Sequence, residues 1–213
     1  NNSIAEVDYF LFPELKYSFQ YETLRILNIP IHKILSDKKN RHIEAETLIV
    51  TDHPWYKKGH VHDEMINMPE WIINWLRNKF LNHAEYKNLS DKIYIDRSDS
   101  LFNHCKIINS DEVWEFLKKK GFTKIKLTEM SFKNQIGLFN SANMIIGAHG
   151  AGLSNMIFSN PNTKVIEFQP ENYSNKFFPR VSKINNLNYH KIVSKSLKLN
   201  INKSLGDIIV ELE

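Results

Sequence analysis

One stretch, residues 143–170 (NMIIGAHGAGLSNMIFSNPNTKVIEFQP), constrains the fold of this chain more than any other. Its apolar residues Met144 to Ile146 run into a glycine-rich turn, and a second apolar pair, Val165 and Ile166, follows further on. Short apolar runs of this kind are typical of parallel strands covered on both faces. The stretch predicts a strand, a tight turn, a short helix and a second strand that ends near Glu167.

The turn holds the residue types that an anion-binding site requires. Gly150 and Gly152 allow the backbone to approach a ligand closely, and the helix that follows would direct its N–H groups toward the turn. The imidazole of His149 can donate to a phosphate or a sugar hydroxyl. Because ligands bind at the carboxyl edge of open α/β sheets, we predict phosphates at the turn and ribose hydroxyls on Glu167. A turn that only packs tightly is the alternative.

The second half of the chain alternates between strand and helix patterns, which predicts a parallel sheet. Besides the strands at Met144 and Val165, strands are expected at 93–96, 122–127 and 189–193, and helices at 110–120, 132–139 and 176–184. Asn109 and Glu112 form a capping signature for the first of these helices, which Gly121 ends. Ser131 is expected to cap the next helix.

The first half is less regular. Strands are expected at 7–12, 31–35 and 48–50, a helix at 21–27, and a second helix that starts at Met68-Pro69-Glu70. The polar stretch 82–91 suggests a boundary, so we predict two lobes, residues 1–88 and 89–213. The fold class expected is α/β, with two Rossmann-like lobes that have parallel sheets and an incomplete N-terminal lobe.

Composition bounds the class of protein. The chain has 213 residues, 42% of them hydrophobic, and a net charge of +4 with a pI of about 9.0. The lysines are scattered, and the densest run, 118–120, fits the last turn of a helix, so nucleic acid is not expected as a partner. No apolar run approaches the length of a membrane span. Cys105 is the sole cysteine, which excludes an internal disulfide and favours a reducing compartment; we interpret it as a small, partly buried side chain.

The chain resembles glycosyltransferase family 61, which includes capsular-polysaccharide-type transferases in bacteria and xylosyl- and N-acetylglucosaminyltransferases in eukaryotes. The likeness is carried by IYIDR at residues 93–97, by Asn109 with the acids that follow it, and by IIGAHGAGLSN with VIEF at the end of the next strand. YETLRILNIP and ETLIVTDHPW add less specific similarity.

The resemblance implies a GT-B fold and an inverting transfer from a nucleotide sugar, with a UDP-sugar as the first choice, to a polysaccharide, glycolipid or other glycan acceptor. It implies no cofactor and no metal, and no Asp-x-Asp pair occurs at a plausible metal-binding position. The predicted location is cytoplasmic, with the inner face of a membrane and peripheral membrane association left open.

The resemblance also assigns candidate nucleotide-binding residues. They are Arg97, Lys106, His149, Gly150, Ala151, Gly152, Asn155 and Glu167. Arg97 can pair bidentately with a diphosphate, or form a surface ion pair with Asp96 or Asp99. Asn155 is either a ligand residue or a polar group satisfied inside the first helical turn, and Glu167 is either the ribose-binding acid or a solvated acid.

The catalytic base is not assigned by the sequence. Asp52, His60, His62 and Asp63 are weak candidates, since a histidine or aspartate near the cleft has suitable chemistry; an ordinary polar loop is the alternative. The base-bearing segment of the family is expected to lie before Asn1.

Two other functions remain open: a non-catalytic module that binds a nucleotide sugar or a partner, and an unrelated α/β enzyme. The second is disfavoured because no Gly-x-Gly-x-x-Gly turn follows a first strand.

Overall fold

The chain forms two compact units, Asn1–His53 and Pro54–Glu213. The computed structural model describes residues 6–59, 64–99, 105–171, 173, 176–196 and 206–212. The division falls well before the boundary expected near residue 88, so helix α3 (Glu70–Phe80) belongs to the second unit. The reason is aromatic packing, because the ring of Phe80 meets Phe132 and Phe158 edge-on. The roles given to the two lobes stay predictions.

The first unit is small. A parallel pair joins β1 (Phe10–Phe12) to β2 (Ile34–Ser36), with α1 (Ser18–Ile26) and the 3₁₀ helix η2 (Ile31–Lys33) between them. These elements confirm the strands expected at 7–12 and 31–35, in shortened form, and the helix at 21–27. The strand expected at residues 48–50 is wrong, because Leu48 and Val50 are both 78% exposed and lie outside any described strand.

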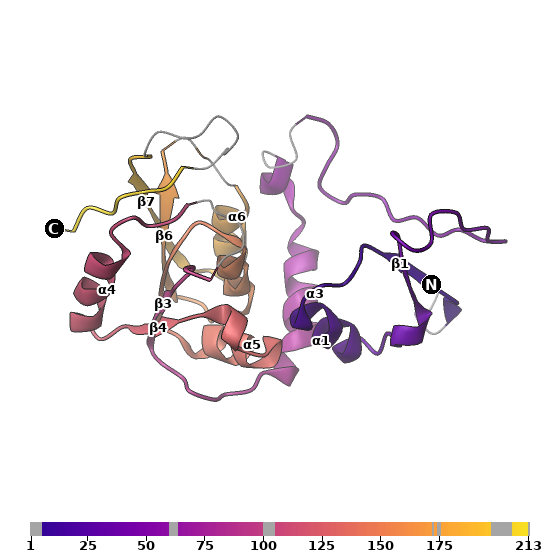
Figure 1. Ribbon diagram of the computed structural model, residues 1–213, viewed down its shortest axis with the longest axis horizontal. Helices are drawn as coiled ribbons and strands as arrows, with labels where there is room; N and C mark the ends of the chain where they lie inside the picture. The colour runs from indigo at the N-terminus through magenta and orange to yellow at the C-terminus, as the bar shows by residue number, and fades with distance from the viewer. Residues whose placement is uncertain are drawn as a thin grey trace. The chain divides into compact units, whose positions relative to one another are not determined.

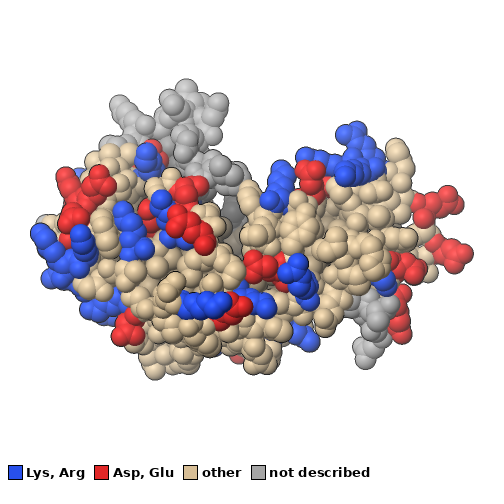
Figure 2. All heavy atoms as spheres, turned by 60° about the horizontal axis from the view of Figure 1, so that its bottom comes forward, with Lys and Arg blue, Asp and Glu red and all other residues tan. Residues whose placement is uncertain are grey.

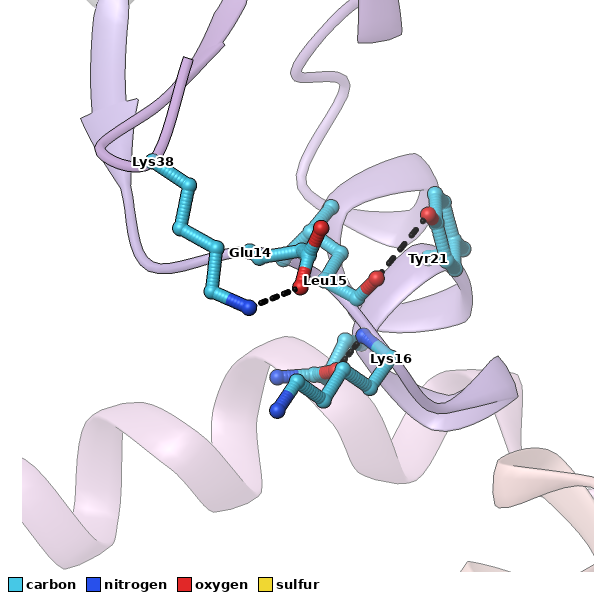
Figure 3. A network of polar contacts seen from close by, with 6 residues as sticks. Glu14, Leu15, Lys16, Tyr21 and Lys38 are labelled. Carbon is cyan, nitrogen blue, oxygen red and sulfur yellow. Dashed lines mark hydrogen bonds and ion pairs between the residues drawn. The ribbon is translucent and has the colours of Figure 1, made fainter. Parts of the chain in front are cut away.

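Polar contacts at the surface of the first unit fix the entry to α1 (Figure 3). The Gln20 side chain accepts from the backbone N–H groups of Lys16 and Tyr17, at 2.7 and 2.9 Å. Lys38 and Glu14 form an ion pair at 2.8 Å. Hydrogen bonding to Lys38 lowers the pKa of Glu14. Both side chains are exposed, so this pair contributes little to stability.

The second unit is built on a five-stranded sheet in which every neighbouring pair is parallel. The strands are β3 (Lys92–Ile95), β4 (Thr123–Ile125), β5 (Met144–Ala148), β6 (Lys164–Pro170) and β7 (Asn188–Ser194), in the spatial order β4-β3-β5-β6-β7. This confirms the α/β class and a Rossmann-like parallel sheet, with strands at the predicted places. The GT-B arrangement and the incompleteness of the first lobe stay predictions.

Helices cover both faces of this sheet (Figure 1). α4 (Ser110–Lys119) lies on one face, and α5 (Phe132–Ser141) and α6 (Phe177–Asn185) lie on the other. The core beneath α4 is apolar and consists of Tyr94, Ile107, Val113, Leu117, Phe122, Ile146, Ala148, Phe168, Ile208 and Val210. The predicted helix ends are confirmed at Gly121, whose φ is +81°, and at Ser131, whose Oγ accepts from the N–H of Asn134 at 3.2 Å.

The capping box expected at Asn109 is wrong. Its side chain makes no capping bond to α4. Instead its Oδ1 accepts from the N–H of Val210 at 3.1 Å and its Nδ2 donates to the Val210 carbonyl at 2.8 Å. An amide side chain that pairs with a peptide group in this way satisfies two backbone groups at once. Asn109 therefore fastens the C-terminal segment to the residues that precede α4.

The strand order creates a switch point. β3, the first strand of this sheet along the chain, has its successor β4 on one side and the later strand β5 on the other. In doubly wound sheets, the crevice beyond the carboxyl ends of two such strands is where ligands bind. The residues that follow β3 and β5 therefore lie at the edge where a ligand would bind.

The surface carries charges of both signs. On the face drawn in Figure 2, Lys and Arg side chains are interspersed with Asp and Glu, as the scattered lysines of the sequence indicate. Within the described ranges, no helix has the length and apolarity needed to cross a membrane.

Candidate functional site

Strand register brings three predicted residues, Arg97, His149 and Glu167, to one edge of the sheet. Ile95 pairs with Gly147, and Gly147 pairs with Glu167. Because side chains alternate along a strand, His149, two residues after Gly147, lies on the same face as Glu167. Arg97, two residues after Ile95, follows the end of β3 at the same edge. The His149 N–H also continues the ladder by donating to the Phe168 carbonyl at 2.8 Å.

Arg97 folds over the glycine-rich turn. Its Nη1 donates to the carbonyl oxygen of His149, and its guanidinium fills the space that a side chain at Gly150 would need. Burial lowers the pKa of Arg97, against opposing contributions from Cys105 and Asp99. The side chain thus places a partly desolvated positive charge on the turn, where a bound anion would gain most.

Asp96 has partners of its own. Its carboxylate accepts from the N–H and the hydroxyl of Ser98, both at 3.0 Å, and lies 3.9 Å from Nζ of Lys124. The polar contacts of Asp96 therefore point to Ser98 and Lys124. The phosphate role of Arg97 stays a prediction.

His149, Glu167 and Tyr189 form a buried chain of contacts. His149 Nδ1 contacts Oε1 of Glu167, and the Tyr189 hydroxyl donates to Oε2. Glu167 is fully buried and His149 is 6% exposed. Glu167 is thus not a solvated surface acid, and protein groups engage both of its carboxylate oxygens. Its predicted contact with ribose hydroxyls stays a prediction.

Aromatic rings enclose the imidazole of His149. Its ring centroid lies 4.5 Å from that of Tyr173 and 5.4 Å from that of Phe178 on α6. Packing on several sides restricts the ring to few orientations. Together with the contact to Glu167, these rings hold His149 at the turn.

The short helix after the turn is a 3₁₀ helix, η6 (Ala151–Phe158). Its first bond runs from the Leu153 N–H to the Gly150 carbonyl at 3.1 Å, so the N–H groups of Ala151 and Gly152 precede the intrahelical bonds. Asn155 donates to Oε1 of Gln135 on α5 at 2.9 Å, a partner outside its own helical turn. A phosphate-binding role for Gly150, Ala151, Gly152 or Asn155 stays a prediction.

Lys106 and Cys105 are neighbours in sequence but differ in exposure: the Lys106 side chain is exposed and Cys105 is buried. The Lys106 N–H donates to Oδ1 of Asp207 at 3.2 Å and its carbonyl accepts from Ile208, while its side chain is exposed. Cys105 is 1% exposed. Burial raises the pKa of its thiol to about 12, so it is a protonated core residue rather than a nucleophile. The phosphate role of Lys106 stays a prediction.

Of the candidate bases, Asp52 alone is described. It lies on an exposed loop of the first unit, where its Oδ1 accepts from the N–H of His53 at 2.7 Å. His60, His62 and Asp63 lie outside the described residues. Within the described part of the chain, no three His, Cys, Asp or Glu side chains gather as metal ligands would; the absence of a metal requirement stays a prediction.

Sequence reasoning missed Tyr189 and Gln169. Tyr189 pairs with Val165 in the register of β6 and β7, which makes it a diagonal neighbour of Glu167 on the same face. Gln169 follows two residues later on that face and is 1% exposed, and neither polar atom of its side chain has a partner among the described residues. The alternation of side chains along β6 could have placed Gln169 on the same face as Glu167. The position of Tyr189 beside Glu167 could be predicted only if the order of the strands were known.

The fold and this edge of the sheet define an α/β protein with a cationic turn at its switch point. Comparison with known proteins gives the family: the model of Glycosyltransferase 61 matches residues 7–166, and the chain belongs to this family.

Two curated relatives are similar over a shorter stretch. The chain is 33% identical over 97 residues to "Beta-1,2-xylosyltransferase" of Arabidopsis thaliana and 32% identical over 94 residues to "Beta-1,2-xylosyltransferase RCN11" of Oryza sativa subsp. japonica. These matches cover 42% and 43% of this chain, and the chain spans 18% of the length of each relative.

Proposed function

We propose that this protein is an inverting glycosyltransferase that uses a nucleotide sugar, with a UDP-sugar as the first choice, and transfers the sugar to a glycan acceptor without a metal ion. The second unit would bind the donor at the edge of its sheet. The acceptor class proposed is a polysaccharide, glycolipid or other glycan. Family membership supports the transferase chemistry, and the two xylosyltransferase relatives support a sugar donor.

The arrangement of Arg97 and His149 at the switch point is the observation that carries the proposal. An inverting transfer places the sugar carbon in line between the attacking hydroxyl and the departing phosphate, and the growing charge on the diphosphate must be neutralised. The Arg97 guanidinium, fixed on the His149 carbonyl, supplies a fixed positive charge. Donors positioned in advance of the reaction contribute most to such stabilisation, about 3–4 kcal/mol each.

The amides at the start of η6 add to this site. The N–H groups of Ala151 and Gly152 precede the first intrahelical bond, and such groups are good partners for phosphate oxygens. A guanidinium, an imidazole and two amides would then do what a divalent cation does in metal-dependent transferases. The base that deprotonates the acceptor is not among these groups.

A donor-consumption assay on the protein tests this proposal. UDP-sugars, GDP-sugars and CMP-sugars are offered in turn, with excess chelator or with added Mg²⁺, and release of the nucleotide is followed. The proposal predicts turnover of one donor class at the same rate in both conditions, with inverted configuration in the product. Turnover that chelator abolishes, or a product of retained configuration, would overturn the metal-free inverting mechanism.

The same assay distinguishes a glycosyltransferase from the alternative function, a non-catalytic module that binds a nucleotide sugar. A protein that binds a nucleotide sugar but releases no nucleotide with any acceptor tested would be a binding module that keeps the donor site. Binding is measured by titration calorimetry with the intact nucleotide sugar. Arg97→Ala is expected to weaken binding under both functions, so the presence or absence of turnover decides between them.

A further inference from the structure

Tyr189, Glu167 and His149 are linked in a way that a ribose-binding acid does not require. Glu167 has no exposed surface, and its two carboxylate oxygens contact the Tyr189 hydroxyl and Nδ1 of His149. A carboxylate is buried this completely only when hydrogen-bond donors replace its lost hydration. Each carboxylate oxygen therefore has a protein partner before any ribose hydroxyl is bound.

The proton positions follow from the chemistry of the three groups. An ionised carboxylate can only accept hydrogen bonds. Burial and the charge of Glu167 raise the pKa of Tyr189 far above its ordinary value, so its hydroxyl stays protonated and donates. With Glu167 as the acceptor, we assign Nδ1–H of His149 to this contact, and the remaining ring nitrogen is Nε2. With Nδ1 protonated, Nε2 carries a proton only when the ring is an imidazolium.

The position of His149 in the fold indicates which part of the substrate its Nε2 would contact. His149 directly precedes Gly150 in the turn proposed for the diphosphate, and the Arg97 guanidinium contacts its carbonyl oxygen. In an in-line displacement, the base acts on the side of the sugar carbon opposite the leaving phosphate. A group at the phosphate end therefore serves the leaving group, and it does so best as a charged donor.

We propose that Glu167 is a positioning residue which, supported by Tyr189, holds His149 as an imidazolium whose Nε2–H donates to the diphosphate of the donor nucleotide. This inference rests on the proposed function. The proton on Nε2 comes from solvent when the nucleotide binds and returns to solvent when the diphosphate leaves. Glu167 thus acts on the nucleotide through His149 rather than through a bond to the ribose.

Several charged or titratable groups lie near His149, Glu167 and Tyr189 and would contribute to the pH dependence of nucleotide binding. Besides Glu167 on β6 and Tyr189 on β7, they are Arg97 after β3, Tyr173 after β6, the Cys105 thiol and Asp207 near the C-terminus. α6 presents the apolar ring of Phe178. The experiments therefore compare variants at one pH rather than rely on a pH profile.

Two nucleotides distinguish a phosphate role from a ribose role. Calorimetric affinities of UDP and 2′,3′-dideoxyuridine diphosphate are measured for the unaltered protein, Glu167→Gln and Tyr189→Phe. We expect Glu167→Gln to weaken both nucleotides by the same factor, about tenfold or more, and Tyr189→Phe to act in the same direction with a smaller factor. Loss of UDP affinity with an unchanged affinity for the dideoxy compound would show that Glu167 binds the ribose, and would overturn the proposal.

Tyr94→Phe is the matched control. Tyr94 is also a buried sheet tyrosine, 3% exposed, but it lies on the opposite face, stacked on Trp114. Its loss of a hydroxyl should leave both affinities unchanged. If Tyr94→Phe weakened nucleotide binding as much as Tyr189→Phe does, the effect at Tyr189 would be explained by general destabilisation, and the proposal would be contradicted.

The ¹⁵N NMR signals of the His149 ring give a readout that a merely structural role would not move. His149→Asn identifies the signals among those of nine histidines. We expect Nδ1 to be protonated in the free protein and both nitrogens to be protonated with UDP bound, and we expect Glu167→Gln to abolish the doubly protonated state. An unprotonated Nδ1 in the free protein would contradict the proposal.

The two measurements also separate this inference from the proposed function. If no nucleotide binds the unaltered protein, the proposed function fails and the phosphate contact fails with it, whereas the Nδ1 signal of the free protein still decides whether Glu167 positions His149. If Glu167→Gln does not fold, Tyr189→Phe carries both tests, since it leaves the carboxylate and the imidazole in place.

Discussion

The Arg97 guanidinium lies where a side chain at Gly150 would be. A Cβ placed on residue 150 would lie 2.3 Å from Cζ of Arg97 and 2.6 Å from its Nε and Nη1. The backbone at Gly150 is extended, with φ at 165°, so no conformational requirement demands glycine there. The missing side chain is what lets the guanidinium lie on the turn.

Gly150→Ala is therefore expected to displace the Arg97 guanidinium while the fold survives. The clashing atoms belong to the end of a flexible side chain, so the free energy of unfolding should change by about 1 kcal/mol or less. UDP affinity should fall about tenfold or more, because a charge-assisted contact to phosphate is lost. Denaturant unfolding and calorimetry measure the two quantities.

Gly152→Ala is the control for that variant. A Cβ there would lie 2.8 Å from Cδ1 of Leu127, an apolar side-chain end. Its effect on stability should be similar, and its effect on UDP affinity smaller. Equal losses of affinity in the two variants would indicate that the turn, rather than Arg97, holds the nucleotide.

Cys105 should be unreactive in the folded protein. Burial raises the pKa of its thiol to about 12 from 9.0, and the thiolate is the form that iodoacetamide attacks. At pH 8 we expect alkylation to be at least about tenfold faster in denaturant than in buffer, since the unfolded thiol ionises more readily. Equal rates in the two solvents would refute burial of the thiol.

The same pKa predicts how stability depends on pH. The raised folded-state pKa contributes stability in full below pH 9.0, and the contribution is lost as pH rises toward about 12, because the unfolded thiol releases its proton first. Cys105→Ala should therefore lose stability less steeply than the unaltered protein above pH 9.0. Parallel pH profiles of the two proteins would contradict the assignment.

Asn109→Ala should release the C-terminal segment. The side chain makes two hydrogen bonds to Val210, at 2.8 and 3.1 Å, so its loss should cost about 2 kcal/mol of unfolding free energy. Amide hydrogen exchange at Val210 should accelerate. Glu112→Ala is the control, because Glu112 is exposed and its carboxylate accepts from the Asn109 amide at a longer distance, 3.3 Å. If Glu112→Ala proves the more damaging, a capping box operates after all.

Gln169→Leu is expected to stabilise the protein. Within the described part of the chain, the Gln169 side chain is buried without a hydrogen-bond partner, and replacing such a group by an apolar one should contribute about 1 kcal/mol. Asn185→Leu is the contrast, because the Asn185 Nδ2 donates to the Ile157 carbonyl at 2.7 Å and to the Met156 carbonyl at 3.4 Å, and the variant loses both bonds. The midpoint temperature of thermal unfolding should rise in Gln169→Leu and fall in Asn185→Leu.

Much of the second unit could be predicted from its sequence, because local signals and tertiary structure agree there. The apolar runs at Ile93, Met144 and Val165 each became strands of a parallel sheet. Ser131 caps its helix as expected, and Gly121 ends one. Since parallel strands end at one edge of a sheet, Arg97, His149 and Glu167 could be expected near each other without coordinates.

Where prediction failed, a partner distant in sequence decided the outcome. Leu48 and Val50 are apolar, but a strand also needs a neighbour, and none is described for them. Asn109 had a helix to cap, yet it bonds to Val210, about a hundred residues further on. The contacts that Glu167 makes depend on strand order, which periodicity alone does not give. No local pattern carries information of this kind.

The central claim is that a nucleoside diphosphate binds at the turn, held by cationic and amide groups rather than by a metal. Calorimetric titration of the protein with UDP, GDP and CMP in excess chelator, repeated with Arg97→Ala, tests it most directly. We expect one nucleoside diphosphate, UDP first, to bind in chelator, and we expect Arg97→Ala to weaken its binding about tenfold or more. Binding that appears only when Mg²⁺ is restored, or that is indifferent to Arg97, would contradict the account.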